Sequence, residues 1–144
     1  MNDYVTAKHG ISKKMSANDI GLNGSHQAGI LIPKNNEILS FFPKMNSIEK
    51  NPRVIMRFFD ENQEKWNFNF IFYNNKYFGG TRNEYRLTCM TSYIRMNDLR
   101  VGDEIIFSLN FSGERFIRFK RVSKGYSIQD GVIRLSDDWK IIKI

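Results

Sequence analysis

The sequence predicts a mainly β fold, a closed or nearly closed antiparallel barrel with two short helices. Three observations support this fold class: apolar side chains alternate with polar ones in several segments, glycine-containing turns separate these segments, and helical patterns are few. A chain of 144 residues suits one domain with a buried core. We therefore expect a single domain over residues 1–144, with a loose N-terminal arm over residues 1–12.

Strands are predicted wherever apolar side chains recur at every second position. The clearest case runs from Trp66 to Tyr73, where Asn67 and Asn69 separate aromatic residues. The charged link before this run predicts a hairpin with the preceding strand. In chain order, the predicted strands cover residues 28–32, 52–60, 66–73, 85–89, 104–110, 115–122, 132–135 and 139–142.

Two short helices interrupt these strands. Asn35 and Asn36 can cap a helix over residues 37–42, and Pro43 ends it because proline has no N–H to donate. The second helix is predicted over residues 92–99, before a glycine-containing turn.

The charge balance favours a polyanionic partner. Lys and Arg total 22 against 15 Asp and Glu, which gives a net charge of +7. A basic domain gains affinity for nucleic acid because neutralised phosphates release counterions. The sequence shows no apolar run of about 18 residues and no charged-then-apolar leader. We therefore expect no membrane insertion, no secretion and a cytoplasmic location. The single cysteine, Cys89, cannot form a disulfide within the chain.

Enzyme signatures are nearly absent. There is no P-loop and no Gly-x-Gly-x-x-Gly motif, and two histidines with one cysteine do not have zinc-site spacing. We predict no catalytic residue, no metal and no cofactor. Two alternatives stay open: a small metal-dependent nuclease using Asp138 and Lys140, and a barrel that binds carbohydrate or protein through Trp66, Tyr73 and Tyr77.

Two polar segments carry the candidate binding residues. The first covers residues 16–34 and presents Ser25, His26 and Gln27 in a glycine-containing loop, although such a loop can also satisfy its own backbone. The second covers residues 73–86. Its arginine, asparagine and glutamate side chains can pair with base edges, whereas its lysine, tyrosine and threonine suit phosphate oxygens. A glutamate among arginines favours base reading, because it repels phosphate. The alternative is a solvated strand end in which Glu84 pairs with a neighbouring arginine.

The same two segments, SANDIGLNGSHQAGILIPK and YNNKYFGGTRNEYR, closely resemble the N-terminal, effector-DNA-binding domain of EcoRII-type restriction endonucleases. That family is related to the plant B-three DNA-binding domains. The resemblance implies a seven-stranded open pseudobarrel whose two arms grip the major groove of double-stranded DNA. It also implies a recognition domain of a larger restriction protein, either an EcoRII-like nuclease or a McrB-like subunit. The nuclease or GTP-hydrolysing motor would then lie elsewhere in the parent protein or in a partner subunit.

Together, the residue chemistry and the resemblance assign roles to individual side chains. The residues expected to read bases are Ser25, His26, Gln27, Arg82, Asn83, Glu84 and Arg86. The residues expected to contact phosphates are Lys13, Lys14, Lys34, Lys76, Tyr77 and Thr81.

Overall fold

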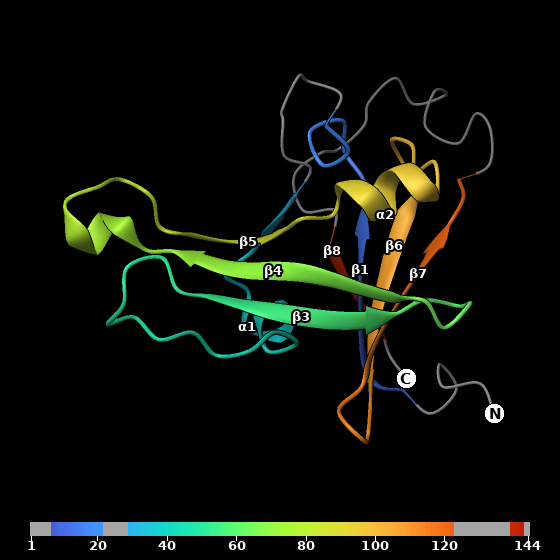
Figure 1. Cartoon of the computed structure of the whole chain (residues 1–144), viewed down its shortest axis with the longest axis horizontal. Coiled ribbons are helices and arrows are strands. Elements are labelled where there is room, and N and C mark those ends of the chain that lie inside the picture. Colours follow the sequence, from blue (N-terminus) through green and yellow to red (C-terminus); the bar gives the residue numbers. More distant parts are fainter. Residues whose placement is uncertain (1–6, 22–28, 123–138, 143–144) are drawn as a thin grey trace.

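The computed structural model describes residues 7–21, 29–122 and 139–142. Its eight described strands form one curled sheet in the order β2-β5-β4-β3-β7-β6-β1-β8 (Figure 1). The strands are β1 (Ala7–Lys14), β2 (Ile30–Ile32), β3 (Arg53–Phe59), β4 (Lys65–Tyr73), β5 (Glu84–Thr88), β6 (Glu104–Asn110), β7 (Arg115–Lys120) and β8 (Trp139–Ile142). The helices are α1 (Asn36–Leu39), the 3-10 helix η1 (Asn75–Phe78) and α2 (Thr91–Met96). The predicted mainly β pseudobarrel is confirmed, with eight strands in place of seven.

One described strand, β1 at the N-terminus, is not among the strands predicted from alternation. The loose arm expected over residues 1–12 is wrong for residues 7–12, because they belong to β1, which pairs with β6 on one side and β8 on the other. The β1 sequence, AKHGISKK, has little apolar alternation. Two neighbouring strands nevertheless supply partners for its backbone groups, and this pairing overrides the weak local preference. The strand predicted at residues 132–135 lies outside the described residues.

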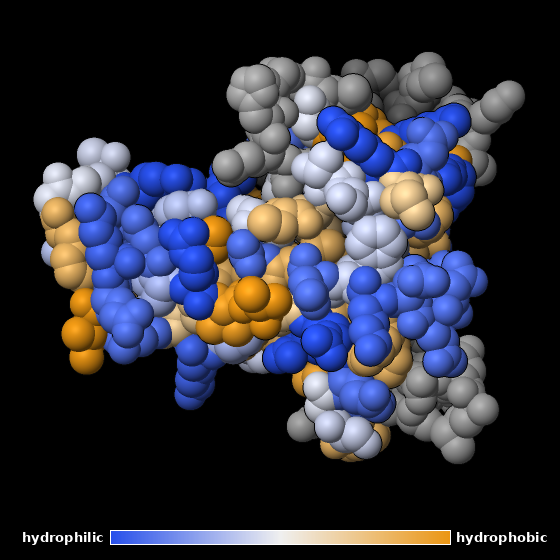
Figure 2. All heavy atoms as spheres, viewed as in Figure 1, coloured by the Kyte–Doolittle hydropathy of each residue, from blue (hydrophilic) through white to orange (hydrophobic). Residues whose placement is uncertain are grey.

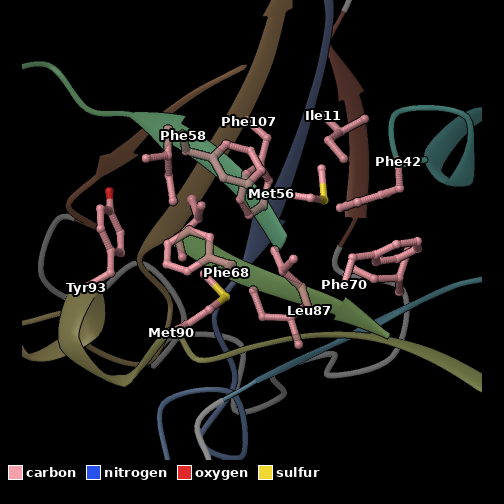
Figure 3. Close-up of a cluster of buried hydrophobic side chains, with 14 of the residues drawn as sticks. Ile11, Phe42, Met56, Phe58, Phe68, Phe70, Leu87, Met90, Tyr93 and Phe107 are labelled. Carbon is pink, nitrogen blue, oxygen red and sulfur yellow. The ribbon is translucent and has the colours of Figure 1, made fainter. Parts of the chain in front are cut away.

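The core lies inside the curl of the sheet. Phe68, Phe70 and Phe72 alternate along β4 and are all buried, as the period of two predicts. Phe42, just after α1, stacks on Phe70 with ring centroids 4.8 Å apart, so the segment that follows α1 packs against the inner face of β4 (Figure 3). Phe107 of β6 reaches the same cluster. None of the helices in the described part of the chain is long and apolar enough to cross a membrane.

The helices are close to their predicted places. Asn35 caps α1, since its Oδ1 accepts the backbone N–H groups of Glu37 and Ile38 at 2.9 and 3.2 Å. Regular helix ends at Leu39, earlier than predicted, and the chain continues to Phe42 in tighter turns.

The curled sheet is joined by contacts weaker than a full strand ladder at two places. Strands β3 and β7 share one parallel bridge, between Phe59 and Phe116. At the opposite side, the edge strands β2 and β8 meet through the Trp139 indole N–H, which donates to the Leu31 carbonyl at 3.2 Å. Trp139 also stacks on Phe107, with ring centroids 6.3 Å apart. The Trp139 side chain therefore connects the two edges.

Trp139→Phe tests this connection, because it removes the indole donor and keeps an aromatic ring. We expect the free energy of unfolding to fall by about 0.5–1.5 kcal/mol, the usual net contribution of one hydrogen bond. Urea denaturation of both proteins measures the difference. An unchanged midpoint would show that the two edges hold together without this bond.

Candidate nucleic-acid interface

Residues 74–83, between β4 and β5, project from one end of the sheet and are called here the β4–β5 arm (Figure 1). Asn74 anchors the base of the arm. Its fully buried side chain donates to the Glu49 carbonyl at 2.8 Å and accepts the Asn51 N–H at 2.7 Å. The Asn51 side chain in turn accepts the Asn74 N–H at 3.1 Å. The arm is therefore tied to the loop that leads into β3.

Hydrogen bonds within the arm fold its tip into a compact turn. The helix η1 ends at Gly79, whose φ of 90° is a left-handed conformation that suits glycine. Asn75 Oδ1 accepts the Arg82 N–H at 2.7 Å, and the Lys76 N–H donates to the Arg82 carbonyl at 2.9 Å. A Cβ on Gly80 would lie 2.7 Å from the Asn75 side chain and would displace it. These contacts set the backbone position of Arg82.

Glu84 bridges the two arginines of this region. Arg82 donates from Nε and Nη2 to Glu84 Oε1 at 3.0 and 2.7 Å, and Arg86 Nε lies 3.4 Å from Glu84 Oε2. The Arg82 guanidinium also stacks over the Tyr73 ring, 3.6 Å from its centroid. Tyr73 and Glu84 are partners in the β4–β5 register, so strand pairing brings the ring beneath the arginine.

The ion pairs of Glu84 agree with the alternative of a solvated strand end. They also leave part of each guanidinium able to bind a ligand. In the described part of the chain, Nη1 of Arg82 and of Arg86 makes no hydrogen bond, so each guanidinium keeps one free edge. The Arg82 and Arg86 side chains are 42% and 28% exposed. The site therefore presents one guanidinium that hydrogen bonds orient, that of Arg82, and a second, that of Arg86, that forms an ion pair with the same carboxylate.

The pKa of Glu84 reflects these neighbours. Partial burial raises the pKa, but the hydrogen bond from Arg82 and the charges of Arg86 and Arg82 outweigh burial, so the pKa lies below its ordinary value of 4.5. Glu84 is therefore ionised at neutral pH, as an acceptor-only group.

An NMR titration of the Glu84 carboxyl is expected to show a midpoint below 4.5. The stability from these ion pairs is present above the unfolded-state pKa and is lost as the pH falls through the lower folded-state pKa. Arg82→Ala should raise the midpoint, because it removes a hydrogen bond and a positive charge. Equal midpoints in the wild type and the variant would contradict the bridge.

Half of the predicted phosphate contacts lie on the β4–β5 arm. Lys76, Tyr77 and Thr81 are exposed on the arm itself, and Lys34 is exposed just after β2. Asn83, predicted to read bases, is half-buried, and its Nδ2 lies 3.5 Å from the Tyr77 hydroxyl. The structure thus brings the polar residues of the second predicted segment together on one projecting unit.

Lys13 lies apart from this group. It shares the inward face of β1 with Ile11, and its side chain is only 8% exposed. Its ammonium lies 2.9 Å from Asp19 Oδ2 and donates to the Lys14 carbonyl at 2.9 Å. These contacts give Lys13 an internal structural role, so the structure does not favour the phosphate contact predicted for it. Lys14 is half-buried at the end of β1 and pairs in register with Glu104.

The first predicted arm is only partly described. Ser25, His26 and Gln27 lie outside the described residues. The strand that follows them, β2, is paired with β5, and Leu31 lies opposite Arg86 in this register. Leu31 is 45% exposed. The end of the first polar segment therefore lies beside an arginine of the second.

Two residues have structural roles that the sequence did not indicate. Tyr73 supports the Arg82 guanidinium, and Asn74 anchors the arm. Asn74 and its partner Asn51 are 23 residues apart. Neither role leaves a local pattern, because the partners meet only after β3, β4 and β5 have paired.

The aromatic residues considered for a carbohydrate- or protein-binding barrel do not lie together. Trp66 donates its indole N–H to Asp60 Oδ2 at 2.9 Å and packs edge-on against Tyr93. Trp66 and Tyr73 are separated by an odd number of positions along β4, so they lie on opposite faces of the sheet. Trp66, Tyr73 and Tyr77 therefore do not form one aromatic platform.

Lys140, considered for the nuclease alternative, also has a structural partner. Lys140 Nζ lies 3.3 Å from Glu104 Oε2, Trp139 joins β8 to β2, and Asp138 lies outside the described residues. Across the described ranges, no three His, Cys, Asp or Glu side chains gather as a candidate metal site.

Comparison with known proteins identifies relatives of this arrangement. Residues 6–100 match the family described as "Restriction endonuclease EcoRII, N-terminal". The chain is 38% identical over 79 residues to the type II restriction enzyme EcoRII of Escherichia coli, a match that covers 53% of this chain and 19% of that enzyme. The chain thus spans about a fifth of the length of this relative.

A solved structure titled "Arabidopsis FUS3-DNA complex" has a similar fold, with a TM-score of 0.61 and 18% sequence identity. The similarity covers 78% of this chain and 96% of that chain. The family match extends from β1 through α2 and includes the whole β4–β5 arm. On this evidence of sequence and fold, the chain belongs to the family of EcoRII N-terminal domains.

Proposed function

We propose that this domain binds double-stranded DNA at a specific sequence and serves as the target-recognition module of a bacterial restriction endonuclease. The observation that carries the proposal is the pair of guanidinium groups held by Glu84, each with one free edge. Such an edge matches O6 and N7 of guanine, and a carboxylate can accept the N4 amino group of cytosine. The relatives support the choice of ligand, since one is a restriction enzyme and the other was solved with DNA.

The reading surface is proposed to enter the major groove. Only there do all four base pairs present distinct patterns of donors and acceptors. Arg82, Asn83, Glu84 and Arg86 would contact bases from the β4–β5 arm and β5. Ser25, His26 and Gln27 would contact bases from the first arm. The exposed residues Lys34, Lys76, Tyr77 and Thr81, with Lys14, would position the phosphates.

The test is selection of bound duplexes from a random pool by the 144-residue chain. We expect the retained duplexes to share a short sequence, and point changes within it to cost about 1–3 kcal/mol each. A retained pool without a common sequence would reject specific recognition.

The chemistry of restriction is proposed to belong to another part of the system. In this proposal an EcoRII-like nuclease domain, or a McrB-like subunit with a GTP-hydrolysing motor, acts on DNA that this domain has located in the bacterial cytoplasm. Two features support a non-catalytic domain: Lys140 is paired with Glu104, and the matched region is a small fraction of the E. coli enzyme.

Incubation of the chain with its selected duplex and magnesium separates this proposal from the nuclease alternative. We expect a shift of the duplex on a native gel and no cleavage on a denaturing gel. Lys140→Ala serves as the matched variant. Cleavage by the wild type that Lys140→Ala abolishes would favour the nuclease.

A further inference from the structure

We propose that Arg53 and Arg57 on β3 form a second contact row for DNA, which binds phosphates outside the base pairs that the arm reads. This inference rests on the proposed function. It extends the interface across two further strands, to arginines outside the two polar segments.

The strand register places Arg53 in line with the reading residues. Leu31 of β2, Arg86 of β5, Ile71 of β4 and Arg53 of β3 are successive partners across the sheet. Adjacent strands are about 4.8 Å apart, so the backbones at Arg86 and Arg53 are separated by about 10 Å. This equals about three base-pair steps of 3.4 Å. A duplex read at Arg86 therefore has phosphates within reach of Arg53.

Arg57 continues the row along β3. It lies four residues after Arg53, about 13 Å along the strand, and on the same face. That face is the outer one. Met56 and Phe58, which alternate with Arg57 along the strand and point to the other face, are buried. Arg53 thus lies in line with the proposed reading residue Arg86, and Arg57 lies farther from the arm along β3.

The charge of this face favours a polyanion. Arg53 and Arg57 are both exposed, and no acidic side chain in the described ranges pairs with either. Among the outward positions of β2, β5, β4 and β3, the only acid is Glu84, which already bridges the two reading arginines. Exposed arginines without an acidic neighbour are suited to phosphate oxygens.

An acidic protein surface is the competing partner. Ile55 lies between the two arginines on the same face and is 70% exposed, and Figure 2 shows an apolar patch over β3 with hydrophilic residues on both sides. DNA is favoured because the row is continuous, through the β3–β4–β5 register, with the proposed reading residues. A single duplex can contact both groups without a second partner.

The test uses Arg53→Gln/Arg57→Gln in the 144-residue chain and the duplex selected by the wild type. That duplex is made in two lengths, one ending at the recognised sequence and one extended by about one helical turn on each side. On the long duplex, the slope of log K against log salt concentration should become shallower by about 1.8, since each phosphate contact contributes about 0.9. On the short duplex, the slope should be unchanged.

The preference for the selected sequence over a scrambled one should also be unchanged, because phosphate contacts carry no sequence information. The matched control is Lys44→Gln/Arg95→Gln, which removes the same net charge from exposed residues after α1 and on α2. Thermal melting confirms that both variants fold. The proposal is overturned if the Arg53/Arg57 variant binds both lengths as the wild type does, or if the control has the same effect. Loss of sequence preference in the wild type would instead reject the proposed function.

Discussion

Replacing Arg82 with alanine is expected to weaken binding of the preferred duplex by about 1–3 kcal/mol, or roughly 5–150-fold, with a much smaller effect on unrelated duplexes. The physical reason is geometric. Arg82 is held by Glu84 at 2.7 Å and by the Tyr73 ring at 3.6 Å, so its free edge is oriented before DNA binds. Less conformational freedom is then lost on binding. Fluorescence anisotropy with the selected duplex and with a scrambled duplex measures both affinities.

Two further variants distinguish the contribution of base contacts to affinity from that of positive charge. Arg82→Lys keeps the positive charge but loses the planar fork, and it should discriminate between the duplexes nearly as poorly as Arg82→Ala. Lys76→Ala removes an exposed charge from the same arm and should weaken both duplexes alike. If Arg82→Ala also weakened both duplexes by the same factor, Arg82 would be a phosphate contact and the base-reading assignment would fail.

Replacing Asn74 with alanine should have the largest effect on stability, a loss of about 2–4 kcal/mol in the free energy of unfolding. The substitution leaves the Glu49 carbonyl and the Asn51 N–H without their partners in a partly buried place, and each such loss costs about 1–3 kcal/mol. Urea unfolding measures the loss. Affinity for the selected duplex should fall as well, measured where the variant is still folded, because the arm loses its anchor.

Asn67→Ala is the matched control for this prediction. Asn67 lies on the same strand, β4, but is exposed, and changes at such surface positions are usually within about 0.5 kcal/mol. Equal stability of the Asn74 and Asn67 variants would show that the arm is held by its backbone pairing alone.

Local sequence patterns were sufficient to predict the positions of most of the described β-strands. The alternation along β4 placed Phe68 and Phe70 in the core, and Asn35 marked the start of α1. The same patterns failed for β1, because a strand with neighbours on both sides needs few apolar residues of its own. The position of Lys13 depends on the same strand. Once residues 7–14 are known to be a strand, alternation with Ile11 turns Lys13 inward, toward Asp19.

At the candidate site, the order of amino acids shows which chemical groups are present. The predicted strand begins at residue 85, so alternation alone did not place Glu84 on the same face as Arg86. The observed strand β5 begins at Glu84 and puts both side chains on one face. Three further relations follow only from the folded arrangement: Glu84 is shared with Arg82, Tyr73 lies beneath that arginine, and Arg53 is in line with Arg86. Side-chain direction follows from the local period of the backbone, whereas neighbours across a sheet depend on the register of strands that are far apart in the chain.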